Sequence, residues 1–544
     1  LYLLFSILLL LNYGECSPRV DPLVDTNVGL IRGLRADDGD YAMFLGIPYA
    51  QVDPENPFGV STPQPKFEET FEAYDGSAIC PQVYQHNGSL VGSPDCLYLS
   101  VYVPTTATSN HRLPVMIWVY GGAFHRGYFG KDFYGPTYLV KHDVIVVTFN
   151  YRVGAYGFMC LETPEVPGNQ GLKDQFLAMK WVKDNIEAFG GDANKITLFG
   201  ESAGGHSIDL HLLSPKETLY NQVIIQSGSA LAATVLYEPD RLVPIKIADR
   251  LGFETTDINE AISFLANTNP NLVVGTAVEL GIMFKPCIEN EFDGVEPFLT
   301  SSWLHAGTPK VRNMPILIGF NEHELVGSHF NRDAEYFKNL DIVSNYLERI
   351  FNFGDEGLQE MKDAISHFYF GDEVLSEDVK WAIINFDSDF TYIHPVQRSI
   401  QKYLDARAGN IYYYMFSYVG GRNALIVEDN AYDGSCCASH ADELSYLFKM
   451  NHRPDPTPQD EVTIERMTTM WTNFVKFSDP TPQTNELLPV KWTPITRDTY
   501  TYLNIGAELT SGSRPANDRM AFWDLFYKLN DDKQSNSEAG NDPN

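Results

Sequence analysis

The stretch Gly200-Glu201-Ser202-Ala203-Gly204 decides how this chain is expected to fold. The residues before it, Lys195-Ile-Thr-Leu-Phe199, form a short apolar run that predicts a buried strand. Apolar residues within 206–213 can share one helical face, so a helix is expected after it. Glycines permit a sharp turn between the two because they carry no Cβ atom. The pattern is typical of a nucleophile elbow, in which the serine faces the positive end of the helix.

A five-residue motif of this kind also arises by chance, and the alternative is a serine in an ordinary strand-to-helix turn. The rest of the chain favours the elbow, because apolar runs without polar alternation recur between helical segments. Such runs predict a mostly parallel, buried sheet with helices on both faces, which is an α/β fold. Strands are expected at 113–120, 144–149, 195–199, 222–226, 314–320 and 411–416, and a helix at 172–189. Two largely helical insertions, 230–310 and 331–408, are candidates for a cap over the site.

Composition excludes some classes of partner. The 544 residues carry a formal net charge of -32, which disfavours nucleic acid and anionic membranes as partners. The acidic residues are spread along the chain and predict a solvated surface. No linker, repeat or low-complexity tract interrupts the sequence from Ser17 to Tyr527, so residues 17–529 are expected to form a single domain.

The two ends of the chain differ in composition from the residues between them. Residues 1–11 are almost wholly apolar and Gly14-Glu15-Cys16 follows, which predicts that residues 1–16 are a secretory signal peptide that lacks its first residues. The polar residues 530–544 are expected to be a disordered tail. The tail carries no hydrophobic segment, so no membrane anchor is predicted. The sequence therefore predicts a secreted, extracellular protein. It does not indicate an oligomeric state.

Disulfide bonds are expected in a secreted chain. Cys80 and Cys96 flank a short loop, and a bond between them would contribute roughly 3 kcal/mol for a loop of about 15 residues. Asn87-Gly88-Ser89 in that loop is an N-glycosylation acceptor. Bonding the neighbours Cys436 and Cys437 to each other would be strained, so at most one is expected to be bridged, with Cys287 as a candidate partner. The pairing of Cys160 stays open.

Backbone donors for an oxyanion are predicted after the first central strand. Tyr120-Gly-Gly-Ala-Phe124 follows that strand, and its small residues let N–H groups crowd around a developing negative charge. Together with the residue after the nucleophile, this gives three predicted donors: the N–H groups of Gly122, Ala123 and Ala203.

An acid and a histidine should follow the serine in that chain order, as in an α/β-hydrolase. Glu322 and Glu324 both follow the predicted strand at 314–320, and either could be the acid. His440 follows the strand at 411–416 across a loop, where the base is expected. The chain contains no zinc-protease motif, no paired Cys-x-x-Cys motif and no phosphate-binding loop, so no metal or cofactor is predicted.

Many short motifs together resemble the secreted type-B carboxylesterases, which include the cholinesterases, and look closest to the insect secreted esterases of the antennal type. The resemblance covers nearly all of the chain after residue 16. It is carried by Phe44-Leu-Gly-Ile-Pro-Tyr-Ala50, Asp95-Cys-Leu-Tyr-Leu99, Tyr120-Gly-Gly-Ala-Phe124, Asn150-Tyr-Arg-Val-Gly154, Gly168-Asn-Gln-Gly-Leu-Lys-Asp174, Phe189-Gly-Gly-Asp192, Gln226-Ser-Gly-Ser229, Trp471-Thr-Asn-Phe474, the elbow and His440.

The resemblance implies an α/β-hydrolase fold and ester hydrolysis by a Ser-His-Glu triad through an acyl-enzyme. It assigns the acid to Glu324, five residues after Gly319, although Leu325 stands where the family usually has glycine and keeps Glu322 as a minor alternative. It further implies that Glu201 and Ser227 lie beside the reacting residues. A buried ion pair between Arg152 and Asp174 is also implied.

The same resemblance suggests the substrate. A segment with Leu280, Ile282 and Phe284 matches the acyl pocket, where aliphatic groups would admit an apolar chain. Residues 81–95 contain no tryptophan, which cholinesterases use to bind a quaternary ammonium group. Juvenile hormone esterases usually carry glutamine where Glu201 stands. Neutral esters, such as odorants, pheromones or xenobiotics, are therefore the expected small-molecule partners.

Two other functions compete with efficient hydrolysis. One is a slow-turnover scavenger of esters or organophosphates, which would keep the same residues. The other is a non-catalytic adhesion protein of the same fold, and the retained serine disfavours it.

Overall fold

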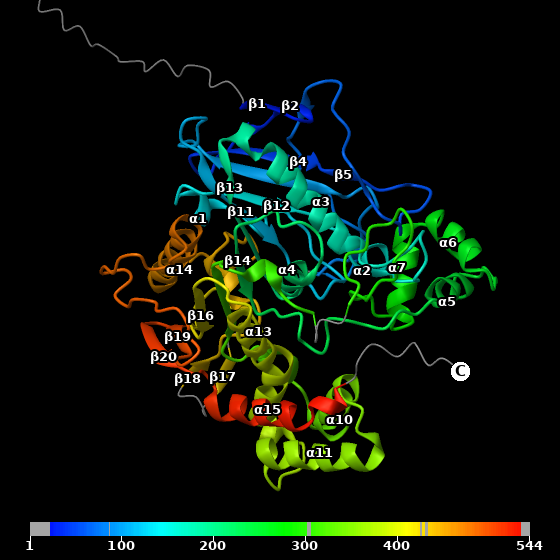
Figure 1. Ribbon diagram of the computed structural model, residues 1–544, viewed down its shortest axis with the longest axis vertical. Coiled ribbons are helices and arrows are strands. Elements are labelled where there is room, and N and C mark those ends of the chain that lie inside the picture. Colours follow the sequence, from blue (N-terminus) through cyan, green and yellow to red (C-terminus); the bar gives the residue numbers. More distant parts are fainter. Residues whose placement is uncertain (1–21, 86, 302–305, 425–426, 430–433, 535–544) are drawn as a thin grey trace, which may run out of the picture.

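A large sheet forms the centre of the molecule in the computed structural model, which describes residues 22–85, 87–301, 306–424, 427–429 and 434–534 (Figure 1). The sheet has eleven strands. In spatial order they are β20 (Leu509–Ser513), β19 (Thr501–Ile505), β16 (Ile411–Phe416), β15 (Ile316–Asn321), β14 (Gln222–Gln226), β13 (Gly191–Glu201), β11 (Leu113–Val119), β12 (Ile145–Phe149), β10 (Tyr98–Pro104), β4 (Tyr41–Pro48) and β3 (Leu34–Arg35). The strands from β19 to β12 are parallel to one another, and the strands at both edges are antiparallel.

The central strands are buried on both faces, which explains their uninterrupted apolar sequences. Every residue of β12, β14 and β15 is buried. The hydrophobic core around them is continuous from Ile31 to Tyr527. The predicted α/β-hydrolase fold, with a mostly parallel central sheet, is therefore confirmed.

Smaller strands lie outside the main sheet. They are β1 (Leu23–Thr26), β2 (Gly29–Arg32) and β7 (Phe71–Glu72) in one sheet, and the pairs β5 (Ala50–Gln51) with β6 (Thr62–Pro63), β8 (Gln82–Val83) with β9 (Leu90–Val91), and β17 (Val427–Asp429) with β18 (Gly434–Cys436).

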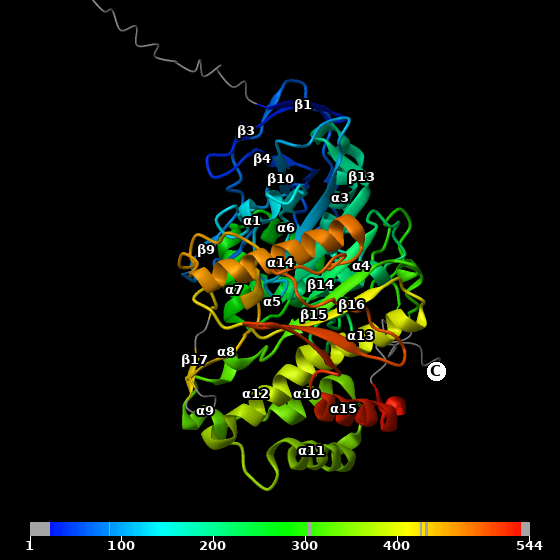
Figure 2. The ribbon, with the colours of Figure 1, turned by 90° about the vertical axis from the view of Figure 1, so that its left-hand side faces the viewer.

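Helices cover both faces of the sheet. Figures 1 and 2 show α14 (Pro458–Phe477) against one face, and α3 (Gln170–Asn185) and α4 (Ala203–Leu213) against the other. The short helices among the strands are α1 (Thr137–Val140) and α2 (Gly154–Phe158). None of the described helices is long and apolar enough to cross a bilayer.

The helices of the two insertions lie outside the sheet (Figure 1). The first insertion holds α5 (Val243–Arg250), α6 (Ile258–Ala266) and α7 (Pro270–Glu279), which lie beside α2. The second holds α8 (Val326–His329), α9 (Ala334–Lys338), α10 (Ile342–Ile350), α11 (Gly354–Phe370), α12 (Lys380–Ser388) and α13 (His394–Asp405), the last two joined by a π-helix at Asp389–Ile393. Of these, α10 and α11 lie at the lower end of the view in Figure 1. The C-terminal α15 (Asn517–Leu529) packs beside α10 and α11, far from it in sequence (Figures 1 and 2). The first insertion is helical only in its middle, because residues 281–301 follow an irregular path.

The order of the strands brings distant residues to one edge of the sheet. The chain passes from β11 to β12 on one side and then to β13 on the other, which makes β11 the point where the strand order reverses. Ligands bind at such a reversal, outside the carboxyl ends of the strands. Val119 pairs with Gly200, and Gln226 pairs with Gly319, so the segments after β11, β13, β14 and β15 meet there.

The ends of the chain are only partly described. The predicted signal peptide, 1–16, lies outside the described residues. The predicted disordered tail begins too early, because Asp531–Lys533 form a 3₁₀ turn and Gln534 pairs with Phe351. The backbone of this segment finds partners on the second insertion, which composition alone does not reveal. Residues 535–544 lie outside the description.

One predicted disulfide bond is confirmed and one candidate pairing is wrong. Cys80 and Cys96 are bonded. Cys287 bonds with Cys160, not with Cys436 or Cys437. Asn169 fixes this pairing, since its amide exchanges hydrogen bonds with the backbone of Cys287 at 2.8 and 3.0 Å. Cys437 is also disulfide-bonded.

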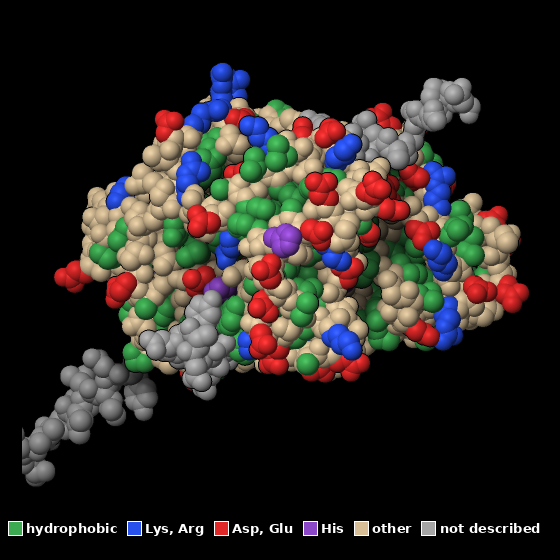
Figure 3. Space-filling view, turned by 90° about the horizontal axis from the view of Figure 1, so that it is seen from below, with side chains coloured by type: hydrophobic (Ala, Val, Ile, Leu, Met, Phe, Trp, Pro, Cys, Tyr) green, Lys and Arg blue, Asp and Glu red, His purple; other side chains and the backbone are tan. Residues whose placement is uncertain are grey.

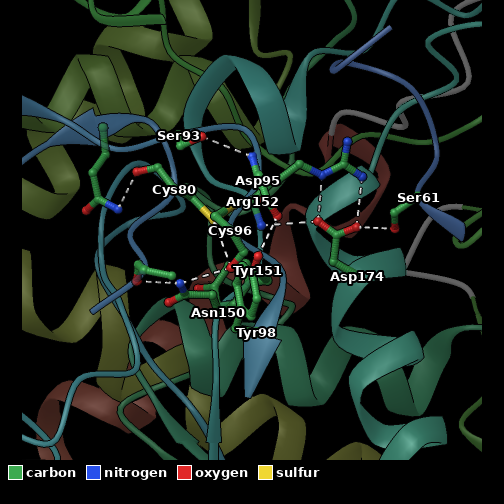
Figure 4. The surroundings of a disulfide bond; sticks show 12 residues. Ser61, Cys80, Ser93, Asp95, Cys96, Tyr98, Asn150, Tyr151, Arg152 and Asp174 are labelled. Carbon is green, nitrogen blue, oxygen red and sulfur yellow. Dashed lines mark hydrogen bonds and ion pairs between the residues drawn. A yellow bond between two sulfur atoms is a disulfide. The ribbon is translucent and has the colours of Figure 1, made fainter. Parts of the chain in front are cut away.

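The expected ion pair between Arg152 and Asp174 is confirmed close to the Cys80–Cys96 bond (Figure 4). Both side chains are fully buried and form two hydrogen bonds of 2.8 Å, and Ser61 donates a third to the carboxylate. Removing one partner of a buried pair of this kind leaves the other charge buried and uncompensated. The pair therefore holds the segments that carry Arg152 and Asp174 together.

The charges on the surface are mixed. Figure 3 shows acidic side chains spread over one face of the molecule and interspersed with basic ones. On this face the negative charge is not gathered into one acidic patch.

Candidate active site

Ser202 stands in a strained turn between β13 and α4. Its backbone has φ 56° and ψ −123°, a conformation that residues with a side chain rarely adopt. The neighbouring chain comes very close to this turn, so residue 204 must be glycine: a Cβ atom there would lie 2.0 Å from the carbonyl oxygen of Val119. The strain presents the Ser202 hydroxyl at the sheet edge, as the elbow motif predicts.

Three side chains form a continuous line of hydrogen bonds. The distance between Ser202 Oγ and His440 Nε2 is 2.8 Å, and that between His440 Nδ1 and Glu324 Oε2 is 2.6 Å. The other carboxylate oxygen of Glu324 accepts bonds from Ser227 Oγ and from the N–H of Asn321, both at 2.7 Å. Glu324 is 1% exposed. Its carboxylate is therefore fixed on three sides and can hold only one orientation of the imidazole.

Glu322 lies apart from this line. Its N–H donates to the carbonyl oxygen of Phe416, and its side chain lines a different cavity together with Tyr502 and Arg519. Burial raises the pKa of Glu322, and Arg519 opposes that rise. Of the two glutamates, the structure brings Glu324 to His440.

The glycine turn after β11 packs directly on the serine. A Cβ atom on Gly121 would lie 2.8 Å from the Glu201 carboxylate and 2.9 Å from Ser202 Cβ, so this position accepts only glycine. The N–H groups of Gly122, Ala123 and Ala203 donate to no acceptor within the part of the chain that the structure describes. These three groups are available to a substrate atom beside Ser202.

The charges around His440 are coupled. Glu201 Oε1 lies 3.1 Å from His440 Nε2, and burial raises the pKa of Glu201 to about 8 although His440 opposes the rise. Burial lowers the pKa of His440, but Glu201 and Glu324 outweigh that effect and raise it to about 9. Protonation of Glu201 removes one of these negative charges and so favours the neutral imidazole.

Sequence reasoning missed two further residues at the site. The Tyr392 hydroxyl lies 3.4 Å from His440 Nε2, and the two rings are 4.5 Å apart. Glu443 is fully buried and accepts hydrogen bonds from Gln226 and Asn321 at 2.9 and 2.6 Å. Glu443 lies only three residues after His440 in the sequence and could have been noticed there. Tyr392 lies in the π-helix of an insertion, where no motif marks it.

A cavity of about 260 Å³ adjoins the glycine turn. Gly122 and Ala123 line it on one side, and Ile282, Phe284 and Val274 contribute apolar walls. The prediction that Leu280 belongs to this pocket is not supported. Leu280 is 40% exposed and caps the end of α7 at the surface, where its side chain faces solvent.

Comparison with known proteins agrees with the fold. A model of the carboxylesterase family matches residues 20–523. The chain therefore belongs to the carboxylesterase family and is a carboxylic ester hydrolase.

Its relatives include a vertebrate lipase, a cholinesterase and an insect esterase. Bile salt-activated lipase of Homo sapiens is 31% identical over 91% of this chain and 67% of its own length. Cholinesterase of Mus musculus is 29% identical over 97% of this chain and 90% of its own length. Esterase FE4 of Myzus persicae is 29% identical over 89% of this chain and 88% of its own length.

Proposed function

We propose that this protein hydrolyses neutral carboxylic esters by a two-step acyl transfer with Ser202 as the nucleophile. The observation that carries the proposal is the line of hydrogen bonds from Ser202 through His440 to Glu324. Such a line activates a hydroxyl that is otherwise a weak nucleophile.

The proposed reaction gives each of these residues a defined role. His440 Nε2 takes the Ser202 proton while Oγ attacks the ester carbonyl, and the N–H groups of Gly122, Ala123 and Ala203 stabilise the oxyanion. His440 then donates the proton to the leaving alcohol. Water activated by His440 hydrolyses the acyl-enzyme, and Glu324 keeps the imidazole oriented and balances its positive charge throughout.

The proposed substrate class rests on the cavity beside Gly122 and Ala123. Its aliphatic and aromatic walls suit an apolar acyl or alcohol chain, and no carboxylate lines it within the described residues. Secretion, a glycan on the exposed Asn87, and odorant, pheromone or xenobiotic esters as natural substrates belong to the same proposal.

An organophosphate that labels active-site serines tests the nucleophile directly. We expect one equivalent to be incorporated, to appear on the peptide that contains Ser202, and to abolish esterase activity in proportion. Measuring turnover against the titrated number of sites separates an efficient enzyme from a slow scavenger. Stoichiometric labelling of another residue, with loss of activity, would falsify the assignment.

A neutral ester should be a better substrate than a choline ester. A quaternary ammonium group gains up to about 2 kcal/mol from an aromatic face, and residues 81–95 offer no tryptophan for this purpose. We expect kcat/KM for naphthyl acetate to exceed that for acetylthiocholine by at least about tenfold. Thioacetate of 3,3-dimethylbutanethiol is the matched control, because it keeps the shape without the charge. If acetylthiocholine is hydrolysed faster than both, the proposed substrate class is wrong.

A further inference from the structure

A buried lysine lies next to the glycine turn and has no role in the proposed reaction. Lys285 follows Phe284, which lines the cavity beside Gly122 and Ala123. Its Nζ donates to the carbonyl oxygen of Ala123 at 3.1 Å and lies 5.6 Å from the centre of the Phe124 ring. Lys285 is only 9% exposed.

The charge of this lysine is not neutralised. Within the described residues no carboxylate pairs with its ammonium group, and the charged or titratable side chains that face it are His125, His206 and Arg349. Buried lysines are almost always paired, because an isolated charge in the interior is costly. Burial, with a smaller contribution from Arg349, lowers the pKa of Lys285 to about 8, so the group still carries its proton at neutral pH.

The segment that Lys285 holds is strained. Ala123 and Phe124 have φ values of 58° and 66°, which places two consecutive residues with side chains in the left-handed region. Residues in this conformation are strained and persist only where their surroundings enforce it. Gly154 N–H secures the carbonyl of Phe124 at 2.7 Å, and Lys285 secures the carbonyl of Ala123.

We propose that Lys285 is a positioning residue of the oxyanion hole. Its hydrogen bond holds Ala123 in the conformation that directs the N–H groups of Gly122 and Ala123 at the substrate. Its unpaired charge lies at the carbonyl oxygen of Ala123, one of the residues whose N–H group is a proposed oxyanion donor. This inference rests on the proposed acyl transfer.

The test compares Lys285→Met and Lys285→Arg with a matched control, Lys310→Met. Lys310 also donates to a backbone carbonyl, that of His211 at 2.8 Å, and burial lowers its pKa to about 8 as well. His211 is near the far end of α4, about 12 Å along the helix from Ala203. The control therefore removes a similar lysine that does not contact the glycine turn.

We expect Lys285→Met to lower kcat by about 10- to 100-fold with KM within about twofold, less than the loss of a direct oxyanion donor. Affinity for a trifluoromethyl ketone, which forms a tetrahedral adduct with the serine, should fall by the same factor. Lys285→Arg should retain at least a third of kcat, and Lys310→Met should match the wild type. Unchanged kcat in Lys285→Met, or a rise in KM alone, overturns the proposal.

Two further measurements keep the outcome clear. If Lys285→Met does not fold, the pH profile of Lys285→Arg decides. Glu201 and His440 titrate in both proteins, so the difference between the two kcat profiles reports Lys285: relative to Lys285→Arg, the wild type should lose kcat as the pH rises through about 8. Superimposable profiles overturn the proposal. Ser202→Ala in the same assay distinguishes failure of the Lys285 proposal from failure of the acyl-transfer mechanism. An active Ser202→Ala refutes the mechanism itself.

Discussion

Replacing Ser202 by alanine is expected to reduce kcat for ester hydrolysis by at least about four orders of magnitude. Loss of the nucleophile in a serine hydrolase costs about 10⁶ in kcat, and the remaining activity comes from the oxyanion donors and from binding. Alanine removes only the Oγ atom, which contacts His440, so the fold loses no packing contact. The melting temperature should therefore stay within a few degrees of the wild type.

Ser214→Ala is the matched control for this experiment. Ser214 is buried like Ser202 and follows the opposite end of the same helix, α4. Its substitution should leave kcat within about twofold, because its hydroxyl is about 16 Å along the helix from the reacting centre. Activity of pure Ser202→Ala above about 1% of the wild type would show that another residue is the nucleophile.

Glu324→Gln is expected to lower kcat by about three to four orders of magnitude, by analogy with the acid of other triads. The amide oxygen of glutamine can keep the two hydrogen bonds from Ser227 and Asn321, which leaves its NH₂ group facing His440 Nδ1. The imidazole must then carry its proton on Nε2. It can no longer accept the proton of Ser202, although the geometry is intact.

Glu322→Gln supplies the comparison for this prediction. Glu322 faces the cavity near Arg519 and makes no bond to His440, so kcat should fall by less than about threefold. Glu322→Gln and Glu324→Gln make the same chemical change at positions two residues apart in the sequence. The opposite ranking would transfer the role of the acid to Glu322 and refute our interpretation of the site.

Local sequence signals were sufficient for the central strands of the sheet and for the candidate residues Ser202 and His440, but not for the edge strands β3, β4, β10, β19 and β20. The apolar run before Ser202 and the glycines around it encode the strand, the turn and the helix within about twenty residues. Similar runs correctly marked β11, β12, β14, β15 and β16 to within two residues at most ends. These strands are buried on both faces, so nearly every residue in them is apolar. The result is a continuous apolar run that is easy to recognise in the sequence.

Features that depend on distant contacts could not be predicted in the same way. The residues alone left Glu322 and Glu324 open and only the family resemblance favoured Glu324, because the direction of each side chain depends on the strand register. The Cys160–Cys287 bond joins segments 127 residues apart, and only the tertiary fold brings them together. Tyr392 and Lys285 come from the insertions, where no motif links a residue to the site. Leu280 was expected in the pocket but does not line the cavity beside Gly122, because a segment match does not say where α7 ends.

The π-helix at Asp389–Ile393 has a consequence for how this enzyme could diverge. A π-helical turn contains one residue more than an α-helical turn, and such turns are frequent at functional sites. Here it carries Tyr392 to His440, while α12 and α13 on either side keep regular packing. Deleting a single residue would turn that side chain by about 100° around the helix. Evolution can therefore alter what reaches the reacting centre through a change of length, with every core residue left in place.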